Sequence, residues 1–252
     1  MLPIRDLNPA RRPAVVNWLL VGITAAIFFF VQSDEDVFVP EEEFLLAQAA
    51  IPCEVVTGEP LSAAEIATGV CDGTDAVPIF PEKNVLLAIV ASIFFHGGLG
   101  HLISNLWVLI IFGNNIEDAY GHGVYLGFYL LAGMAAAAAH IFLNPDSTIP
   151  VVGASGSIAG VMGAYAVMYP TARVTSIIPP FYFWPFAMPA ILFLGIWFFS
   201  QFLLAGADTN IAWEAHVAGF VFGVIVSFLL RGRLRSHSTR DATQYPIGRL
   251  RG

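Results

Sequence analysis

Ser155 lies in a glycine-rich stretch, residues 153–160, with the sequence Gly-Ala-Ser-Gly-Ser-Ile-Ala-Gly. A serine hydroxyl becomes a useful nucleophile when a base removes its proton. The flanking glycines remove side-chain bulk around the hydroxyl, and Gly156 and Gly160 form a face on which a second helix can pack closely. Such stretches are also common packing faces in apolar helices, so this one does not establish chemistry alone.

A candidate base is His216, in the sequence Ala-His-Val-Ala-Gly. An imidazole can accept a proton as a general base and return it as a general acid. Gly219 and Gly223 form a second small-residue face, and its packing against the first would bring His216 to the Ser155 hydroxyl. The alternative is a hydrogen-bonded packing histidine. Glu214 should point to another face of the helix, so the sequence predicts a Ser–His dyad without an acidic third member.

Two further polar residues, His101 and Asn105, are spaced to share one helix face. Together with the Ser155 backbone N–H they could stabilise an oxyanion, where one donor typically contributes about a hundredfold in rate. The alternative for Asn105 is a hydrogen bond to a neighbouring carbonyl. His96 precedes this pair in a glycine-rich stretch, and we expect it to brace that loop.

The elements that must position these residues are membrane-spanning helices. The chain has 252 residues, of which 57% are hydrophobic and only 12% are charged, with a mean hydropathy of +0.72. A soluble domain carries about twice that charged fraction. Six apolar segments are predicted to span the bilayer: 14–31, about 99–116, 124–143, the glycine–serine stretch to 169, about 181–204, and 211–230.

Six spans place both termini on one side of the membrane. Ten of the eleven basic residues then fall on the inner side, as the positive-inside rule expects: Arg5, Arg11, Arg12, Arg173, Arg231, Arg233, Arg235, Arg240, Arg249 and Arg251. The predicted organisation is a cytoplasmic N-terminal tail (1–13), a six-span core (14–231) and a basic cytoplasmic C-terminal tail (232–252). Ser155, His216, His101 and Asn105 would then share one shallow layer near the outer surface.

The first outer loop, residues 32–84, is long and acidic. It holds one basic residue, Lys83, against the acidic residues Asp34, Glu35, Asp36, Glu41, Glu42, Glu43, Glu54, Glu59, Glu65, Asp72, Asp75 and Glu82. A short helix is predicted over 41–50. Cys53 and Cys71 would form a disulfide in an oxidising compartment, or they are two unrelated buried thiols. The sequence shows no zinc-ligand spacing, no nucleic-acid-binding pattern and no need for a metal or organic cofactor.

Taken together, the motifs resemble those of the rhomboid family of intramembrane serine proteases. They are Gly153-Ala154-Ser155-Gly156, Ala215-His216-Val217-Ala218-Gly219, and the ordered set His96, His101, Asn105. The resemblance covers about residues 14–231 and implies an all-α, six-helix membrane bundle around a water-filled cavity open to the outside. It implies Ser155 as nucleophile and His216 as base. It further implies an oxyanion hole and supporting residues: His101, Asn105 and the Ser155 N–H, with His96, Gly153, Gly156 and Gly219.

The sequence departs from the family pattern in two places. Some relatives carry an aromatic residue four positions after the serine, stacked on the histidine, and here that position is Ala159. We expect Tyr165 or Trp213 to hold the His216 ring instead. The Trp-Arg pair that many relatives carry in the first loop is not evident in residues 32–84, which affects the loop's membrane contact and not the chemistry.

The predicted function is an endopeptidase that cuts transmembrane segments near the outer face of a membrane, with transmembrane proteins and the lipid bilayer as partners. The fifth segment, softened by Pro185 and Pro189, could swing aside to admit a substrate helix, and the loop 205–210 is a candidate lid. The alternative is a catalytically silent relative that binds transmembrane helices without cutting them, although such relatives usually lose the serine or the histidine.

Two other classes fit less well. A transporter would carry charge along a path through its spans, and none lies in the middle of any predicted span. A soluble α/β hydrolase would need a strand before the serine, which the continuous apolar segments exclude. The absence of a transit peptide and the short basic ends favour a bacterial inner (plasma) membrane.

Overall fold

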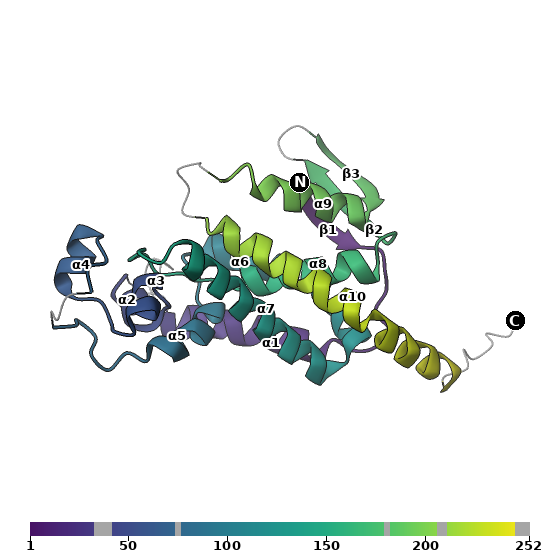
Figure 1. The fold of residues 1–252 in the computed structure, drawn as a ribbon. Helices are drawn as coiled ribbons and strands as arrows, with labels where there is room; N and C mark the ends of the chain where they lie inside the picture. Colours follow the sequence, from purple (N-terminus) through teal and green to yellow (C-terminus); the bar gives the residue numbers. More distant parts are fainter. Residues whose placement is uncertain (33–41, 74–76, 179–181, 206–210, 245–252) are drawn as a thin grey trace, which may run out of the picture.

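The computed structural model describes residues 1–32, 42–73, 77–178, 182–205 and 211–244, with the backbone alone for 182–183 and 235–244. Long helices run beside one another along one axis (Figure 1). In this described part, four helical stretches are long and apolar enough to cross a membrane. They are α1 (Val15–Ile27) with its π-helical extension to Gln32, α6 (Leu99–Tyr120), α7 (His122–Leu143) and the first part of α10 (Trp213–Gln244). The protein is therefore an integral membrane protein.

Several sequence predictions fall outside the described residues. These are the acidic residues at 34–36, Glu41, Asp75, residues 206–210 of the candidate lid, and residues 245–252 of the predicted C-terminal tail, with Arg249 and Arg251. The short helix predicted over 41–50 is confirmed as α2 (Glu42–Gln48). α10 continues well past residue 230, into the segment predicted as a tail.

α8 (Ser155–Met168) is the central helix of the bundle. Each of its residues from Gly156 to Ala166 is buried, and α6, α7 and α10 pack around it. With 14 residues it extends about 21 Å, less than the hydrocarbon core of about 30 Å. At least one end of α8 therefore lies below the surface of a membrane that surrounds the bundle.

The contact between α8 and α10 is backbone against backbone. A Cβ atom added to Gly219 would overlap the carbonyl oxygen of Gly156, and one added to Gly223 would overlap that of Gly160. On the opposite side, a Cβ on Gly156 would lie 2.5 Å from the Cβ of Ala136 in α7. The two glycine faces pack as predicted, because only hydrogen atoms stand between the helices.

Residues 42–73 and 77–91 make up a region that we call the disulfide segment. It contains α2, α3 (Pro52–Thr57), α4 (Ala63–Thr68) and α5 (Val85–Ala91). A disulfide joins Cys53 to Cys71, the first of the two alternatives that the sequence left open. Lys83 Nζ lies 2.6 Å from Glu54 Oε2, with both side chains 2% exposed. Burial lowers the pKa of Lys83, and the Glu54 carboxylate opposes that shift.

Hydrogen bonds tie the disulfide segment to the chain that leads into α8. The Val151 N–H donates to the Ala50 carbonyl at 2.8 Å. Ser92 connects the two regions, since its hydroxyl accepts from the Ala50 N–H at 2.7 Å and its carbonyl accepts from the Gly153 N–H at 2.9 Å. These bonds fix the backbone immediately before Ser155.

The prediction of a single helix over 181–204 is wrong. A strand, β3 (Tyr182–Pro189), occupies the first part, and α9 (Ala190–Gln201) begins only after it. Pro185 and Pro189 lack the N–H that a helix interior requires, and proline is tolerated on an edge strand. The surrounding aromatic residues also favour extended structure.

β3 belongs to a small antiparallel sheet that the sequence did not predict. In the described chain the strand order is β1-β2-β3, with β1 (Leu2–Asp6) and β2 (Arg173–Ile178) as the partners. The N-terminal segment predicted as a tail therefore contributes a strand. The sheet lies beside the start of α9 (Figure 1), where the Ala190 N–H donates to the Ala172 carbonyl at 2.7 Å.

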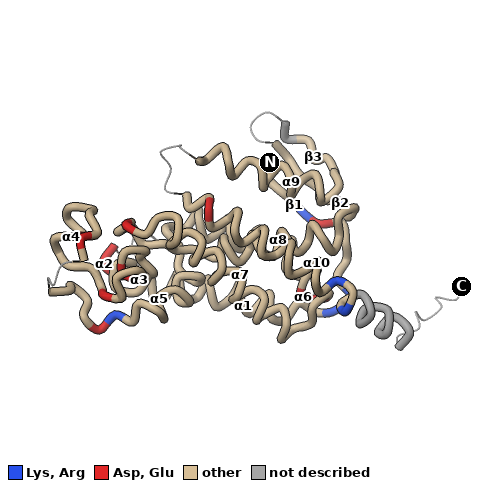
Figure 2. Tube along the Cα trace, in the orientation of Figure 1, with Lys and Arg blue, Asp and Glu red and all other residues tan. Residues whose placement is uncertain are grey.

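The balance of charge differs between the two ends of the molecule. Figure 2 shows mainly acidic residues around α2–α4, with a basic segment among them, and a group of basic residues where α10 leaves the bundle, with acidic residues nearby. Between these ends the helical surfaces are largely apolar, as a surrounding bilayer requires.

The glycine contact gives a direct test of the packing. Gly223→Ala should lower the melting temperature in detergent, because the added methyl group must push α10 away from the Gly160 carbonyl, and overpacking typically costs about 1–3 kcal/mol. The matched control is Gly195→Ala in α9, where an added Cβ meets nothing within 4 Å. Alanine is the better helix former there, so the control should melt at the same temperature or higher. Equal melting temperatures for both variants would contradict the packing.

Candidate active site

Ser155 and His216 lie together at the starts of two adjacent helices. Ser155 is the first residue of α8, and His216 is the fourth residue of α10. The distance from His216 Nε2 to Ser155 Oγ is 2.9 Å, which is a hydrogen bond. Both side chains are half-buried. The glycine contact brings the two helix starts together, so the juxtaposition follows from the packing of α8 on α10.

The other nitrogen of the His216 ring is bound by Gln201, a residue that the sequence reasoning missed. Gln201 Oε1 lies 2.8 Å from His216 Nδ1, and the Gln201 side chain is 4% exposed. A signal was present, because Gln201 is the one amide in the largely apolar stretch 190–204, where Ser200 is the other polar residue, and polar residues in membrane spans usually face the bundle interior.

The ring of His216 is flanked by Trp197 and not by the residues expected. The Trp197 and His216 ring centroids are 6.0 Å apart. Tyr165 packs instead on Phe112, with ring centroids 5.0 Å apart, and Trp213 packs on Phe202 at 5.8 Å. The expectation that Tyr165 or Trp213 holds the ring is therefore wrong. α9 supplies this support because its last turn lies against the first turn of α10.

His101, the third residue of α6, lies close to both Gly153 and Ser155. An added Cβ on Gly153 would lie 3.0 Å from His101 Nε2 and 3.7 Å from Ser155 Oγ. The Gly97 N–H donates to His101 Nδ1 at 3.3 Å, which leaves the proton of the neutral ring on Nε2. Gly153 has φ +126°, in the region that favours glycine, so the absence of a side chain here serves both the backbone and the His101 ring.

The side chains of His96 and Asn105 each contact a backbone carbonyl of a nearby residue. His96 Nδ1 lies 3.3 Å from the Phe94 carbonyl oxygen, and the buried His96 ring meets the His101 ring edge-on, with centroids 5.0 Å apart. The main-chain N–H of His96 donates to Gln32 Oε1 at 3.1 Å. Asn105 donates from Nδ2 to the carbonyl of His101 at 2.9 Å, one helical turn earlier. This is the local hydrogen bond left open for Asn105 at the sequence level. Gln32 was not singled out from the sequence.

Other groups near this layer are occupied elsewhere. Glu214 Oε2 lies 3.4 Å from His140 Nδ1, so its carboxylate faces α7 and not the His216 ring.

Among the described residues, one cluster has metal-ligand types, namely Cys53, Glu65 and Cys71. Its two sulfur atoms form the disulfide and are not thiolate ligands.

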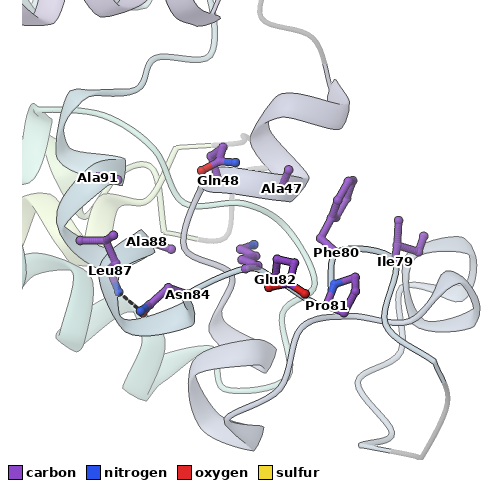
Figure 3. A pocket seen from close by; sticks show the side chains of 11 residues that line it. Ala47, Gln48, Ile79, Phe80, Pro81, Glu82, Asn84, Leu87, Ala88 and Ala91 are labelled. Carbon is purple, nitrogen blue, oxygen red and sulfur yellow. Dashed lines mark hydrogen bonds between the residues drawn. The ribbon is translucent and has the colours of Figure 1, made fainter.

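Two cavities lie in and beside the disulfide segment, away from Ser155. One, of about 420 Å³, is lined by residues of α2, of α5 and of the chain before α5, including Gln48 and Lys83 (Figure 3). The second, of about 430 Å³, is apolar and shares Gln48 and Ala91 with the first. Neither is lined by Ser155 or His216.

Comparison with known proteins identifies the family. Residues 83–233 match the family model described as the Rhomboid domain, and this match covers more than half of the chain. The chain belongs to the rhomboid family. The resemblance seen in the sequence motifs is thereby confirmed.

Curated rhomboid relatives come from bacteria, plants and animals. The chain is 28% identical over 152 residues to "Presenilin-associated rhomboid-like protein A, mitochondrial" of Danio rerio, covering 57% of this chain and 37% of the relative. It is 33% identical over 106 residues to "Rhomboid protease GluP" of Bacillus subtilis (strain 168), covering 40% and 20%. It is 27% identical over 173 residues to "RHOMBOID-like protein 12, mitochondrial" of Arabidopsis thaliana, covering 61% and 49%. This rhomboid chain thus matches between a fifth and a half of the length of these relatives.

Substitution of Gly153 tests the placement of His101 in this rhomboid. Gly153→Ala should reduce the rate at which a fluorophosphonate labels Ser155 by about tenfold or more, because the new Cβ would lie 2.8 Å from His101 Cε1 and must displace a donor from the site. Gly121→Ala is the matched control, since Gly121 also has positive φ but an added Cβ meets nothing within 4 Å. Equal losses in the two variants would attribute the effect to backbone strain and contradict the placement.

Proposed function

We propose that this rhomboid is an intramembrane serine endopeptidase that cleaves the transmembrane segments of membrane proteins near the outer face by a Ser–His dyad. The observation that carries the proposal is the 2.9 Å hydrogen bond between His216 Nε2 and Ser155 Oγ. Membership of the rhomboid family supports it, as does the name of one relative, a rhomboid protease. No cofactor is required in this scheme.

The proposed reaction begins when His216 Nε2 accepts the Ser155 proton as Oγ attacks the scissile carbonyl carbon. The tetrahedral intermediate collapses to an acyl-enzyme, and His216 gives the proton to the departing amine. A water molecule, deprotonated in turn by His216, then attacks the ester, and His216 returns the proton to Ser155 Oγ as the carboxyl product leaves. The half-buried side chains are compatible with access by both the substrate and water.

Charge that develops on the carbonyl oxygen needs hydrogen-bond donors. Ser155 is the first residue of α8, so its N–H has no partner within the helix and the helix dipole favours negative charge at this point. In the proposal His101 Nε2–H is a second donor. Asn105 has two amide N–H groups, of which the bond to the His101 carbonyl uses one, and the other serves as the third donor.

The proposed topology has six spans, namely the four long helical stretches and the shorter helices α8 and α9. Residues 32–84 lie outside and both termini lie in the cytoplasm, with the chain in a bacterial inner (plasma) membrane. The group of basic residues at the end where α10 leaves the bundle supports this orientation (Figure 2). It places the starts of α6, α8 and α10 toward the outer face, where substrate segments would be cut.

Activity-based labelling tests the dyad. Purified wild-type protein in detergent should be labelled by a fluorophosphonate at Ser155 and should cleave a test transmembrane substrate, while Ser155→Ala and His216→Ala should lose both activities because nucleophile and base are each indispensable. The matched controls are Ser157→Ala, a buried serine of the same stretch, and His140→Ala, which pairs with Glu214. Both controls should still be labelled.

Folded wild-type protein that is neither labelled nor active on the substrate would overturn the protease proposal. The catalytically silent relative that binds transmembrane helices would then be the better account.

The orientation is testable through the native disulfide. Spheroplasts, whose outer membrane has been opened and whose inner membrane is intact, are treated with the membrane-impermeant reductant tris(2-carboxyethyl)phosphine and then with a polyethylene glycol maleimide. If residues 32–84 face outward, Cys53 and Cys71 should become modified in the intact spheroplasts, giving a mass shift on a gel. The Cys53→Ser and Cys71→Ser double variant is the blank. A shift that occurs only after lysis would reverse the proposed orientation.

A further inference from the structure

The His216 ring has two nitrogens, and only one of them faces Ser155. The other, Nδ1, meets the amide oxygen of Gln201 at 2.8 Å. Gln201 is the last residue of α9, so the partner of the histidine comes from a third helix, different from those that carry Ser155 and His216.

The orientation of the Gln201 amide is set by the backbone of its own helix. Gln201 Nε2 lies 3.1 Å from the carbonyl oxygen of Trp197. A carbonyl oxygen can only accept, so the NH₂ group of the amide must face Trp197 and the amide oxygen must face His216. The side chain is nearly completely buried, which leaves it few alternative arrangements.

This orientation determines the tautomer of the histidine. An amide oxygen can only accept a hydrogen bond, so His216 Nδ1 must carry the ring proton. In the neutral imidazole Nε2 then has a free lone pair, and this is the atom 2.9 Å from Ser155 Oγ. The carbonyl of Trp197, the amide of Gln201 and the ring of His216 form a chain that ends with a base directed at the serine.

We propose that Gln201 is a positioning residue for His216, which holds the imidazole in the tautomer and orientation that accept the Ser155 proton. The inference rests on the proposed protease function. When His216 becomes protonated, the Gln201 oxygen also faces a full positive charge, so the hydrogen bond strengthens as the reaction proceeds. The Trp197 ring flanks the same imidazole and limits its tilt.

A consequence concerns α9. This helix begins directly after β3. Its first turns are buried at Ala190, Phe193 and Leu194. Its outward face is exposed at Ile196 and Phe199. If α9 swings aside to admit a substrate helix, Gln201 leaves His216. The dyad is then fully oriented only after α9 has returned, so substrate entry and chemistry are separate steps.

The experiment compares Gln201→Met, Gln201→Glu and the control Phe199→Leu, an exposed position on the same helix, by measuring kcat and KM for a test transmembrane substrate in detergent. Gln201→Met keeps the side-chain length and removes the acceptor. Its kcat should fall about 10- to 100-fold with KM nearly unchanged, the range for losing a hydrogen bond to a group that becomes ionised. Gln201→Glu keeps an acceptor oxygen at the same place and should restore most of kcat. Phe199→Leu should match the wild type.

The outcomes separate the two proposals. Wild-type protein without labelling or cleavage overturns the protease function itself. Active wild type with equally active Gln201→Met overturns the positioning role alone, and so does a rise in KM without a fall in kcat. Melting temperatures are measured for all variants, and equal losses of stability and of kcat in the Met and Glu variants would assign Gln201 a purely structural role and overturn the inference.

Discussion

The close approach of α8 and α10 is the contact on which the rest of the structure depends. Within lipid, apolar side chains gain little by leaving one apolar environment for another, so helices associate through van der Waals packing, hydrogen bonds and close backbone contact. Gly219 and Gly223 allow that approach because any side chain at either position would meet a carbonyl of α8. With the backbones in contact, the first turns of the two helices lie side by side, and Ser155 and His216 come within hydrogen-bonding distance.

The polar groups of the site are held by backbone atoms as much as by one another. The Trp197 carbonyl orients Gln201, the Gly97 N–H fixes the tautomer of His101, and the His101 carbonyl engages Asn105. A buried polar group without a partner is costly, and more so where water is scarce. Secondary structure supplies fixed donors and acceptors at helix ends, which is why the reactive side chains gather there.

Hydrogen bonds from the disulfide segment hold the residues that lead into the central helix, α8. The segment's Cys53–Cys71 bond and the buried pair of Lys83 and Glu54 hold a charged region together in a short length of chain. Through Ser92 it then bonds the residues that precede Ser155. The position of Ser155 is thus set by the packing of α8 against α10 and by the hydrogen bonds to the residues that precede Ser155.

The sequence alone determined the family, the glycine faces and the residues of the candidate dyad, because small-residue spacing and isolated polar groups in apolar segments are local patterns. It did not determine that residues 182–189 form a strand, since the apolar aromatic composition suits a helix or a strand and only pairing with β2 decides between them. Nor did it identify Gln201 as the partner of His216, because that contact joins two helices whose relative rotation no local pattern specifies. The tertiary structure decided both, since each depends on which surfaces meet when the helices pack.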